Sequence, residues 1–208
     1  MALVKYNLNG KTVEYDDSEF EILTNGHNKE KYLHYIGNGK NITNPKGNTS
    51  CYAMFQYYEG TELDLTNFDT QNITNMSFMF AHCKSLSELD LSSFDTSNVL
   101  TMECMFCNCI KLKTLDISKF DTSNVMYMEN MFKKCKSLKE LDISSFYIGN
   151  TKILNDIFWD CKSLETLKVN SDFFQFFSAH KKFLFEDCEN VNIIPVTKID
   201  RTINDLFY

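Results

Sequence analysis

Three cysteines stand close together near the middle of the chain, at Cys104, Cys107 and Cys109, with the spacing C-x-x-C-x-C. Thiolates are good zinc ligands, and C-x-x-C is a common spacing in half of a zinc site. A structural zinc site needs four ligands, however, and the chain contains no second C-x-x-C. The spacing therefore argues against a metal site. Whether each thiol is buried or exposed depends on the secondary structure of the segment that contains it.

The segment that holds these cysteines recurs with a period of 26 residues, so that leucine, phenylalanine and cysteine each form a row. The rows are Leu63, Leu89, Leu115, Leu141 and Leu167, then Phe80, Phe106, Phe132 and Phe158, and finally Cys83, Cys109, Cys135 and Cys161. A fixed period in this range is typical of stacked repeats. Cys109 is therefore expected in the core as a small hydrophobe. Cys104 and Cys107 occupy positions that are partly charged in the other repeats, and we expect them on an outer helical surface.

Each repeat contains two kinds of apolar pattern. In "LSELDLSSF", Leu89 and Leu91 alternate with polar residues, as in a strand with one buried face. Between Val99 and Cys109 the apolar residues are three, four and three positions apart, which is the spacing of one helix face. The intervening "DTSN" is rich in residues that favour turns and helix N-caps. The sequence predicts that each repeat is a strand, a turn and a helix.

The repeat also resembles a known family. The segments "LDLSSFDTSNV" and "MECMF" are similar to those of the BspA-like leucine-rich-repeat family of bacterial and phage proteins, and the likeness covers roughly Leu33 to Cys188. The resemblance implies protein binding without catalysis, commonly at cell surfaces.

The predicted fold class is α/β. We expect a leucine-rich-repeat-like solenoid with a parallel β-sheet on the concave side, helices on the convex side, and about five to six repeats between terminal caps. The expected parts are an N-terminal cap at residues 1–26, the solenoid at 27–170, and a degenerate last repeat with a C-terminal cap at 171–208.

Composition excludes several classes of function. The formal net charge is -7 and Arg201 is the one arginine, which argues against direct binding of nucleic acid. No apolar run has the length of a signal peptide or a membrane span, so the sequence predicts a cytoplasmic chain without membrane contact. Catalytic motifs such as H-E-x-x-H and G-x-S-x-G are absent. We therefore expect neither an enzyme nor a cofactor.

Acidic side chains supply the first candidate binding surface. Strand alternation places one set of them on the predicted concave face: Asp64, Glu88, Asp90, Asp116, Glu140 and Asp142. Carboxylates about 5 Å apart repel each other, so they need compensation. One source is hydrogen bonding to the adjacent hydroxyls of Thr66, Ser92, Ser118 and Ser144. The other is a basic surface on a partner.

Outward apolar residues supply the alternative surface. Phe78, Tyr127 and Trp159 fall on the predicted convex helices, and Trp159 takes a position that is Ala, Cys and Lys in the other repeats. Trp is enriched among residues that dominate protein interfaces.

The sequence thus predicts a non-catalytic protein-binding repeat module that acts inside a bacterial cell on a partner with a basic surface. One version rests on the phage members of the resembling family. It is an inhibitor of the anti-CRISPR or anti-defence type that blocks a basic nucleic-acid-binding site on its target. The alternative is a surface adhesin module whose export signal is missing from the chain.

Overall fold

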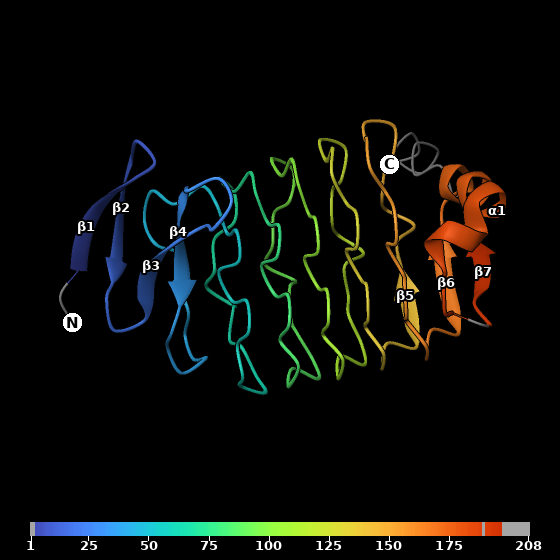
Figure 1. Ribbon diagram of the computed structural model, residues 1–208, viewed down its shortest axis with the longest axis horizontal. Helices are drawn as coiled ribbons and strands as arrows, with labels where there is room; N and C mark the ends of the chain where they lie inside the picture. Colours follow the sequence, from blue (N-terminus) through green and yellow to red (C-terminus); the bar gives the residue numbers. More distant parts are fainter. Residues whose placement is uncertain (1–2, 189, 197–208) are drawn as a thin grey trace, which may run out of the picture.

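The computed structural model describes residues 3–188 and 190–196, and the chain within them forms a row of stacked coils with β-hairpins at one end and a helix at the other (Figure 1). The first hairpin pairs β1 (Leu3–Leu8) with β2 (Lys11–Asp16). Its turn is Asn9-Gly10, where both residues have positive φ, as a two-residue hairpin turn requires. The second hairpin pairs β3 (Phe20–Thr24) with β4 (Lys31–Tyr35), also antiparallel.

The other end of the stack holds one small parallel sheet and the helix. The strand order is β5 (Glu140–Asp142), β6 (Thr166–Val169) and β7 (Asn192–Pro195). Helix α1 (Ser171–Leu184) begins at an N-cap, because Asn170 Oδ1 accepts a hydrogen bond from Phe173 N at 3.0 Å. Phe173 and Phe177 of this helix are fully buried, so α1 covers the end of the apolar core.

A column of phenylalanine rings runs through the core along the stack. Adjacent rings are nearly parallel, within 8°, and their centroids are 5.2 to 5.7 Å apart. The column consists of Phe55, Phe80, Phe106, Phe132, Phe158 and Phe185. One ring per coil therefore sets the contact between neighbouring coils.

The predicted fold class, an α/β leucine-rich-repeat-like solenoid with convex helices, is wrong. Between Val99 and Cys109 the chain is a series of tight turns, with positive φ at Cys104 (52°) and Asn108 (64°). Every second amide, from Met102 N to Asn108 N, donates to a carbonyl of the next coil at 2.8 to 3.0 Å. The amides of Met105, Cys107 and Cys109 donate to the carbonyl three residues back. The three-four-three spacing buries one side of these turns as it would bury a helix face, and in the described residues α1 is the single α-helix.

The predicted parallel sheet is also wrong over most of its length. Among the described residues, only β5, β6 and β7 form a parallel sheet, while the hairpins form two separate antiparallel sheets. At Leu89–Leu91 and Leu115–Ile117 the described chain makes no backbone hydrogen bonds between coils. The continuous parallel pairing lies on the opposite, turn-built side, as isolated bridges through Ser50, Asn75, Thr101, Tyr127 and Ile153.

The "DTSN" motif joins each coil to both of its neighbours. Thr96 Oγ1 donates to Asp121 O of the next coil at 3.0 Å and accepts from Asp121 N at 2.8 Å. Asn98 Nδ2 donates to Gln71 O of the preceding coil at 2.9 Å. The same threonine bonds recur at Thr70 and Thr122, and the same asparagine bond recurs at Asn124 and Asn150. The motif therefore replaces the helix N-cap that its composition suggested.

The cysteine row is buried, as predicted, and it also makes hydrogen bonds. Cys109 Sγ donates to Phe80 O of the preceding coil at 3.1 Å. Equivalent thiol bonds at 2.8 to 3.2 Å are made by Cys83, Cys135, Cys161 and Cys188. The predicted outer position of Cys104 is wrong, since its side chain is only 8 % exposed. The helix-face argument fails there because the segment is not a helix.

Replacing Thr96 by Val tests the bridging hydroxyl. The substitution keeps the shape of the buried Thr96 side chain but removes two part-buried hydrogen bonds to the N-H and C=O of Asp121, so we expect a loss of about 1–3 kcal/mol in the free energy of unfolding. Thr114→Val is the matched control, because Thr114 is exposed and makes no hydrogen bond among the described residues. It should change stability by less than about 0.5 kcal/mol in urea unfolding. Equal losses in the two variants would contradict the bridging role.

Serine substitutions test the positions of the cysteines. Cys109→Ser and Cys104→Ser place a hydroxyl in an apolar site, and each should cost about 1–3 kcal/mol. Cys107 is partly exposed, so Cys107→Ser should be near neutral. Thermal unfolding of the three variants measures these differences. Equal losses for all three, together with zinc in the purified protein, would instead indicate a metal site.

Candidate protein-binding groove

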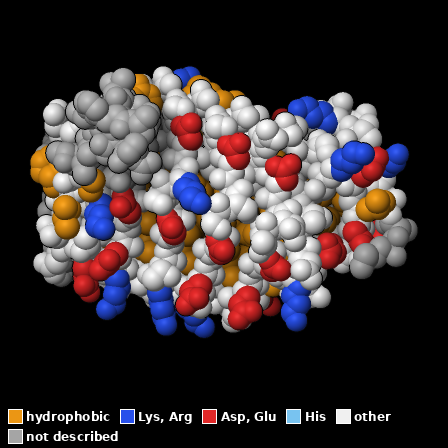
Figure 2. Space-filling model, turned by 180° about the vertical axis from the view of Figure 1, so that it is seen from behind, with side chains coloured by type: hydrophobic (Ala, Val, Ile, Leu, Met, Phe, Trp, Pro, Cys, Tyr) orange, Lys and Arg blue, Asp and Glu red, His pale blue; other side chains and the backbone are white. Residues whose placement is uncertain are grey.

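Acidic side chains stand in rows across successive coils on one face of the molecule, and apolar side chains are visible between them (Figure 2). A groove of about 900 Å³ lies across the coils that carry Leu89, Leu115 and Glu140. Its acidic lining consists of Glu88, Asp90, Asp116 and Glu140, and its basic lining consists of Lys113, Lys119 and Lys139. The groove therefore combines four carboxylates with three ammonium groups.

The alternating sequence positions the groove residues. Leu89 and Leu91 are buried, whereas Glu88, Asp90 and Ser92 on either side of them are exposed. The predicted alternation of buried and exposed side chains is confirmed, although the sheet that it was taken to indicate is absent here. The leucines anchor the segment in the core, and the carboxylates stay accessible to a ligand.

Each aspartate of the row is fixed by the hydroxyl residue two positions later. Asp116 Oδ1 accepts hydrogen bonds from Ser118 N at 3.0 Å and Ser118 Oγ at 2.7 Å. The same arrangement pairs Asp64 with Thr66 and Asp142 with Ser144, and Asp90 accepts from Ser92 N at 2.9 Å. The predicted compensation by the hydroxyl row is confirmed. It uses one oxygen of each carboxylate, and in the described residues Oδ2 of Asp90 and of Asp116 accepts no hydrogen bond.

These hydrogen bonds also keep the carboxylates ionised. Donation from Ser92 holds the pKa of Asp90 below its usual range, Asp116 raises it, and Lys119 lowers it. The pKa of Asp116 is lowered by the bonds from Ser118 and by Lys119. Both groups are therefore negatively charged at neutral pH despite their mutual repulsion.

Not all of the predicted acidic residues line the groove. Asp64 and Asp142 are half-buried and lie outside its lining, whereas Glu88, Asp90, Asp116 and Glu140 are brought together. The sequence analysis missed the groove lysines. Lys113 and Lys139 are 26 residues apart, so the repeat period could have placed them together beside the acidic row.

Backbone groups also remain available in the groove. The amides of Leu89 and Leu115 bond to no other coil within residues 3–188 and 190–196. The coils are tied beside this stretch, by Lys113 N to Ser87 O at 3.0 Å and by Ser93 Oγ to Leu65 O at 3.1 Å. The floor is thus held in place while its own N-H and C=O groups have no partner in a neighbouring coil.

The three residues of the predicted convex alternative each contact another side chain. Phe78 packs edge-on against Tyr52 at 5.8 Å, Tyr127 lies under the Lys152 ammonium at 5.7 Å, and Trp159 lies under those of Lys133 and Lys134 at 4.3 and 4.8 Å. The Trp159 ring is therefore part of a cation–π cluster rather than a bare apolar anchor.

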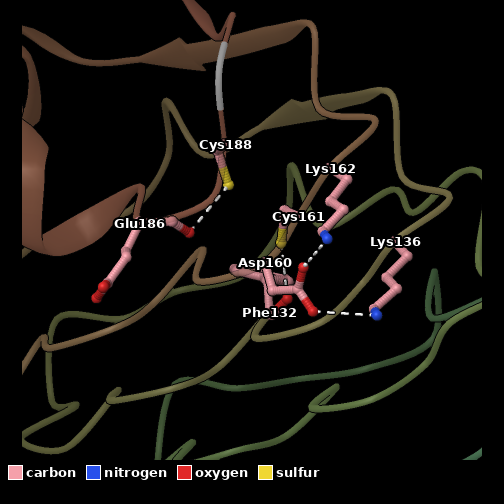
Figure 3. Close-up of polar contacts among 7 residues, drawn as sticks. All are labelled: Phe132, Lys136, Asp160, Cys161, Lys162, Glu186 and Cys188. Carbon is pink, nitrogen blue, oxygen red and sulfur yellow. Dashed lines mark hydrogen bonds and ion pairs between the residues drawn. The ribbon is translucent and has the colours of Figure 1, made fainter.

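A second charged cluster lies around Asp160 (Figure 3). This buried carboxylate forms ion pairs with Lys136 Nζ at 3.1 Å and Lys162 Nζ at 3.3 Å. Burial raises the pKa of Asp160, but the two lysines outweigh burial and lower the pKa overall. The two lysines compensate a buried charge, so the cluster belongs to the scaffold.

Two classes of site are not found in the part of the chain that the structure describes. No three His, Cys, Asp or Glu side chains are grouped so that they could hold a metal ion. The same residues include no helix that is both long enough and apolar enough to cross a membrane.

Acid unfolding tests the role of the aspartate row in the scaffold. The pKa of Asp90 and of Asp116 is lower in the folded chain than the ordinary 3.8. Their stabilisation is therefore present above the unfolded-state pKa and is lost as the pH falls through the folded-state pKa. We expect urea unfolding to show decreasing stability below about pH 4, and a shallower decrease in the Asp90→Asn, Asp116→Asn double variant. An unchanged acid dependence in that variant would contradict this role.

Comparison with known proteins places the repeats in a family. No curated protein and no solved structure matches the chain. Residues 49–171 match the model of a family described as "Mycoplasma protein of unknown function, DUF285". The match confirms a repeat family, whereas the BspA-like assignment stays a prediction. The matched repeats make up more than half of the 208 residues, and the chain therefore belongs to the DUF285 family.

Proposed function

We propose that the chain is a non-catalytic protein-binding module whose groove receives a basic segment of another protein. The observation that carries the proposal is the groove itself, which joins fixed carboxylates, an apolar floor and free backbone groups in about 900 Å³. A groove of this volume fits the few anchoring side chains that dominate binding energy.

The charge of the lining defines the chemistry of the partner. Asp90 and Asp116 lie on adjacent coils in the aspartate row, and each has an oxygen that makes no hydrogen bond within the described chain. A Lys or Arg side chain could therefore pair with them without breaking a scaffold bond. The groove lysines favour polar or acidic residues on both sides of that basic centre. The net charge of -7 would speed the approach of a basic partner at low salt.

The floor of the groove favours an extended segment. Leu89 and Leu115 keep amides that no neighbouring coil uses. A peptide in an extended conformation can satisfy such groups through its main chain while its side chains supply specificity. The partner is therefore proposed to insert a linear segment and not a helix face.

A basic surface that binds nucleic acid is one form that such a partner can take. A chain that covered this surface would compete with nucleic acid and act as an inhibitor. This version of the proposal also depends on Asp90 and Asp116, so the binding experiment with variants of these two residues tests it as well.

Binding of oligolysine tests the groove. Asp90→Asn together with Asp116→Asn should lower the association rate about tenfold at low salt and should flatten its salt dependence. Asp95→Asn with Asp121→Asn is the matched control, because it removes the same charge. Its Oδ1 atoms accept similar bonds from Ser97 and Ser123, but they lie outside the groove. Stopped-flow fluorescence measures both rates.

Two results would contradict this assignment. Equal effects of the two double variants would mean that only net charge matters. A larger effect of Trp159→Ala than of the groove variant would place binding on the other side of the coils. Oligoglutamate, used as a probe of opposite charge, should show no association that depends on the groove.

A further inference from the structure

Two cysteines depart from the scaffold rows and lie together in one tight turn. Cys104 and Cys107 have no counterpart in other repeats, where the equivalent positions hold Phe78 and Ala81 in one coil and Asn130 and Lys133 in another. Cys107 N donates to Cys104 O at 3.0 Å, so the two residues are the ends of a hydrogen-bonded turn. Residues at the ends of such a turn have Cα atoms close enough for a disulfide.

Cys107 is the one accessible thiol of the chain. All eight cysteines lie within the described residues, and seven are buried. The five cysteines of the scaffold row donate to phenylalanine carbonyls. The thiol of Cys107 instead interacts with that of Cys104. An oxidant in solution therefore meets Cys107 first, with a second thiol directly beside it.

Two lysines on the next coil complete the site. Lys133 and Lys134 place their ammonium groups 4.3 and 4.8 Å from the centroid of the Trp159 ring. The hydrogen bond from Cys104 lowers the pKa of Cys107, burial opposes this effect, and the two lysines lower the pKa further. For Cys104 the interaction with Cys107, together with burial and the charge of Glu103, raises the pKa. One thiol is thus activated as a nucleophile, and its neighbour stays protonated.

We propose that Cys104 and Cys107 form a redox-active dithiol that hydrogen peroxide converts to a disulfide. The Cys107 thiolate attacks a peroxide oxygen, the O–O bond breaks, and the leaving oxygen departs as water after taking up a proton. The resulting sulfenic acid is attacked by Cys104 sulfur. The S–S bond forms and a second water leaves with the thiol proton. Two electrons pass from the two thiols to one peroxide, and a small-molecule thiol reverses the change by exchange.

The test uses the full chain, reduced and then treated with hydrogen peroxide. Thiols are counted after denaturation, and peptides are mapped by mass spectrometry. We expect two fewer titratable thiols of the eight, in a peptide that contains Cys104 and Cys107. Cys161 and Cys188, whose thiols also interact with each other but are buried, are the internal control and should stay reduced. Dithiothreitol should restore all eight thiols.

Variants separate the two roles. Cys104→Ser should leave a sulfenic acid on Cys107 that dimedone traps, whereas Cys107→Ser should abolish oxidation of the pair. Lys133→Gln with Lys134→Gln should slow alkylation of Cys107 severalfold at neutral pH, and Lys111→Gln, on an exposed lysine outside the cluster, should not. Should Cys104→Ser fail to fold, the peptide map of the peroxide-treated chain without substitutions still shows whether the Cys104–Cys107 disulfide forms. Eight thiols after peroxide, or a disulfide between two chains instead of within one, would overturn the proposal.

Discussion

Every coil of this chain depends on its neighbours for hydrogen bonds that it cannot make itself. The turns between Val99 and Cys109 show this most clearly, because four of their amides donate to a carbonyl of the next coil and four donate to a carbonyl three residues back. Thr96 and Cys109 extend the same dependence to side chains, through bonds to the next and the preceding coil. An isolated coil would leave these buried groups unpaired, at a cost of about 1–3 kcal/mol each. The stack is therefore cooperative, and its ends need covers of a different construction.

The uneven distribution of these bonds explains where a binding surface is found. On the turn-built side, parallel bridges run from Ser50 to Ile153 and use the backbone of each coil between these residues. On the leucine side of the described chain, the C-terminal strands β5, β6 and β7 are paired, and the coils around Leu89 and Leu115 are held by their apolar side chains and a few flanking bonds. Within the described residues, the N-H and C=O groups of Leu89 and Leu115 make no hydrogen bonds to a neighbouring coil. The groove lies on this leucine side, where a ligand competes with no bond of the scaffold.

The sequence was sufficient to predict which repeated residues are buried, but it was insufficient to predict the backbone conformation between them. The period of 26 placed the phenylalanine column and the cysteine row correctly in the core, and the alternation at Leu89 and Leu91 correctly set the acidic residues outside. The spacing from Val99 to Cys109 failed to distinguish a helix from turns that alternate in φ, because both bury residues three or four apart. Positive φ at Cys104 has no signature in that sequence, since Gly or Asn is the usual sign of it. The ion pair of Asp160 with Lys136 was missed for a related reason, because it joins residues of two coils.

Repetition also separates the residues that build the stack from those that can give it specificity. Leucine, threonine and phenylalanine recur because every coil has to make the same contacts. The aspartate row follows the same rule, since one oxygen of Asp116 is committed to Ser118. A surface of identical coils would bind a partner equally well in several registers, each one coil apart. Residues that occur in one coil alone, such as Lys119 in the groove and Cys104 with Cys107 on the turn side, make one binding register different from the others. Selection for a particular ligand or oxidant can act on these residues without disturbing the contacts that hold the coils together.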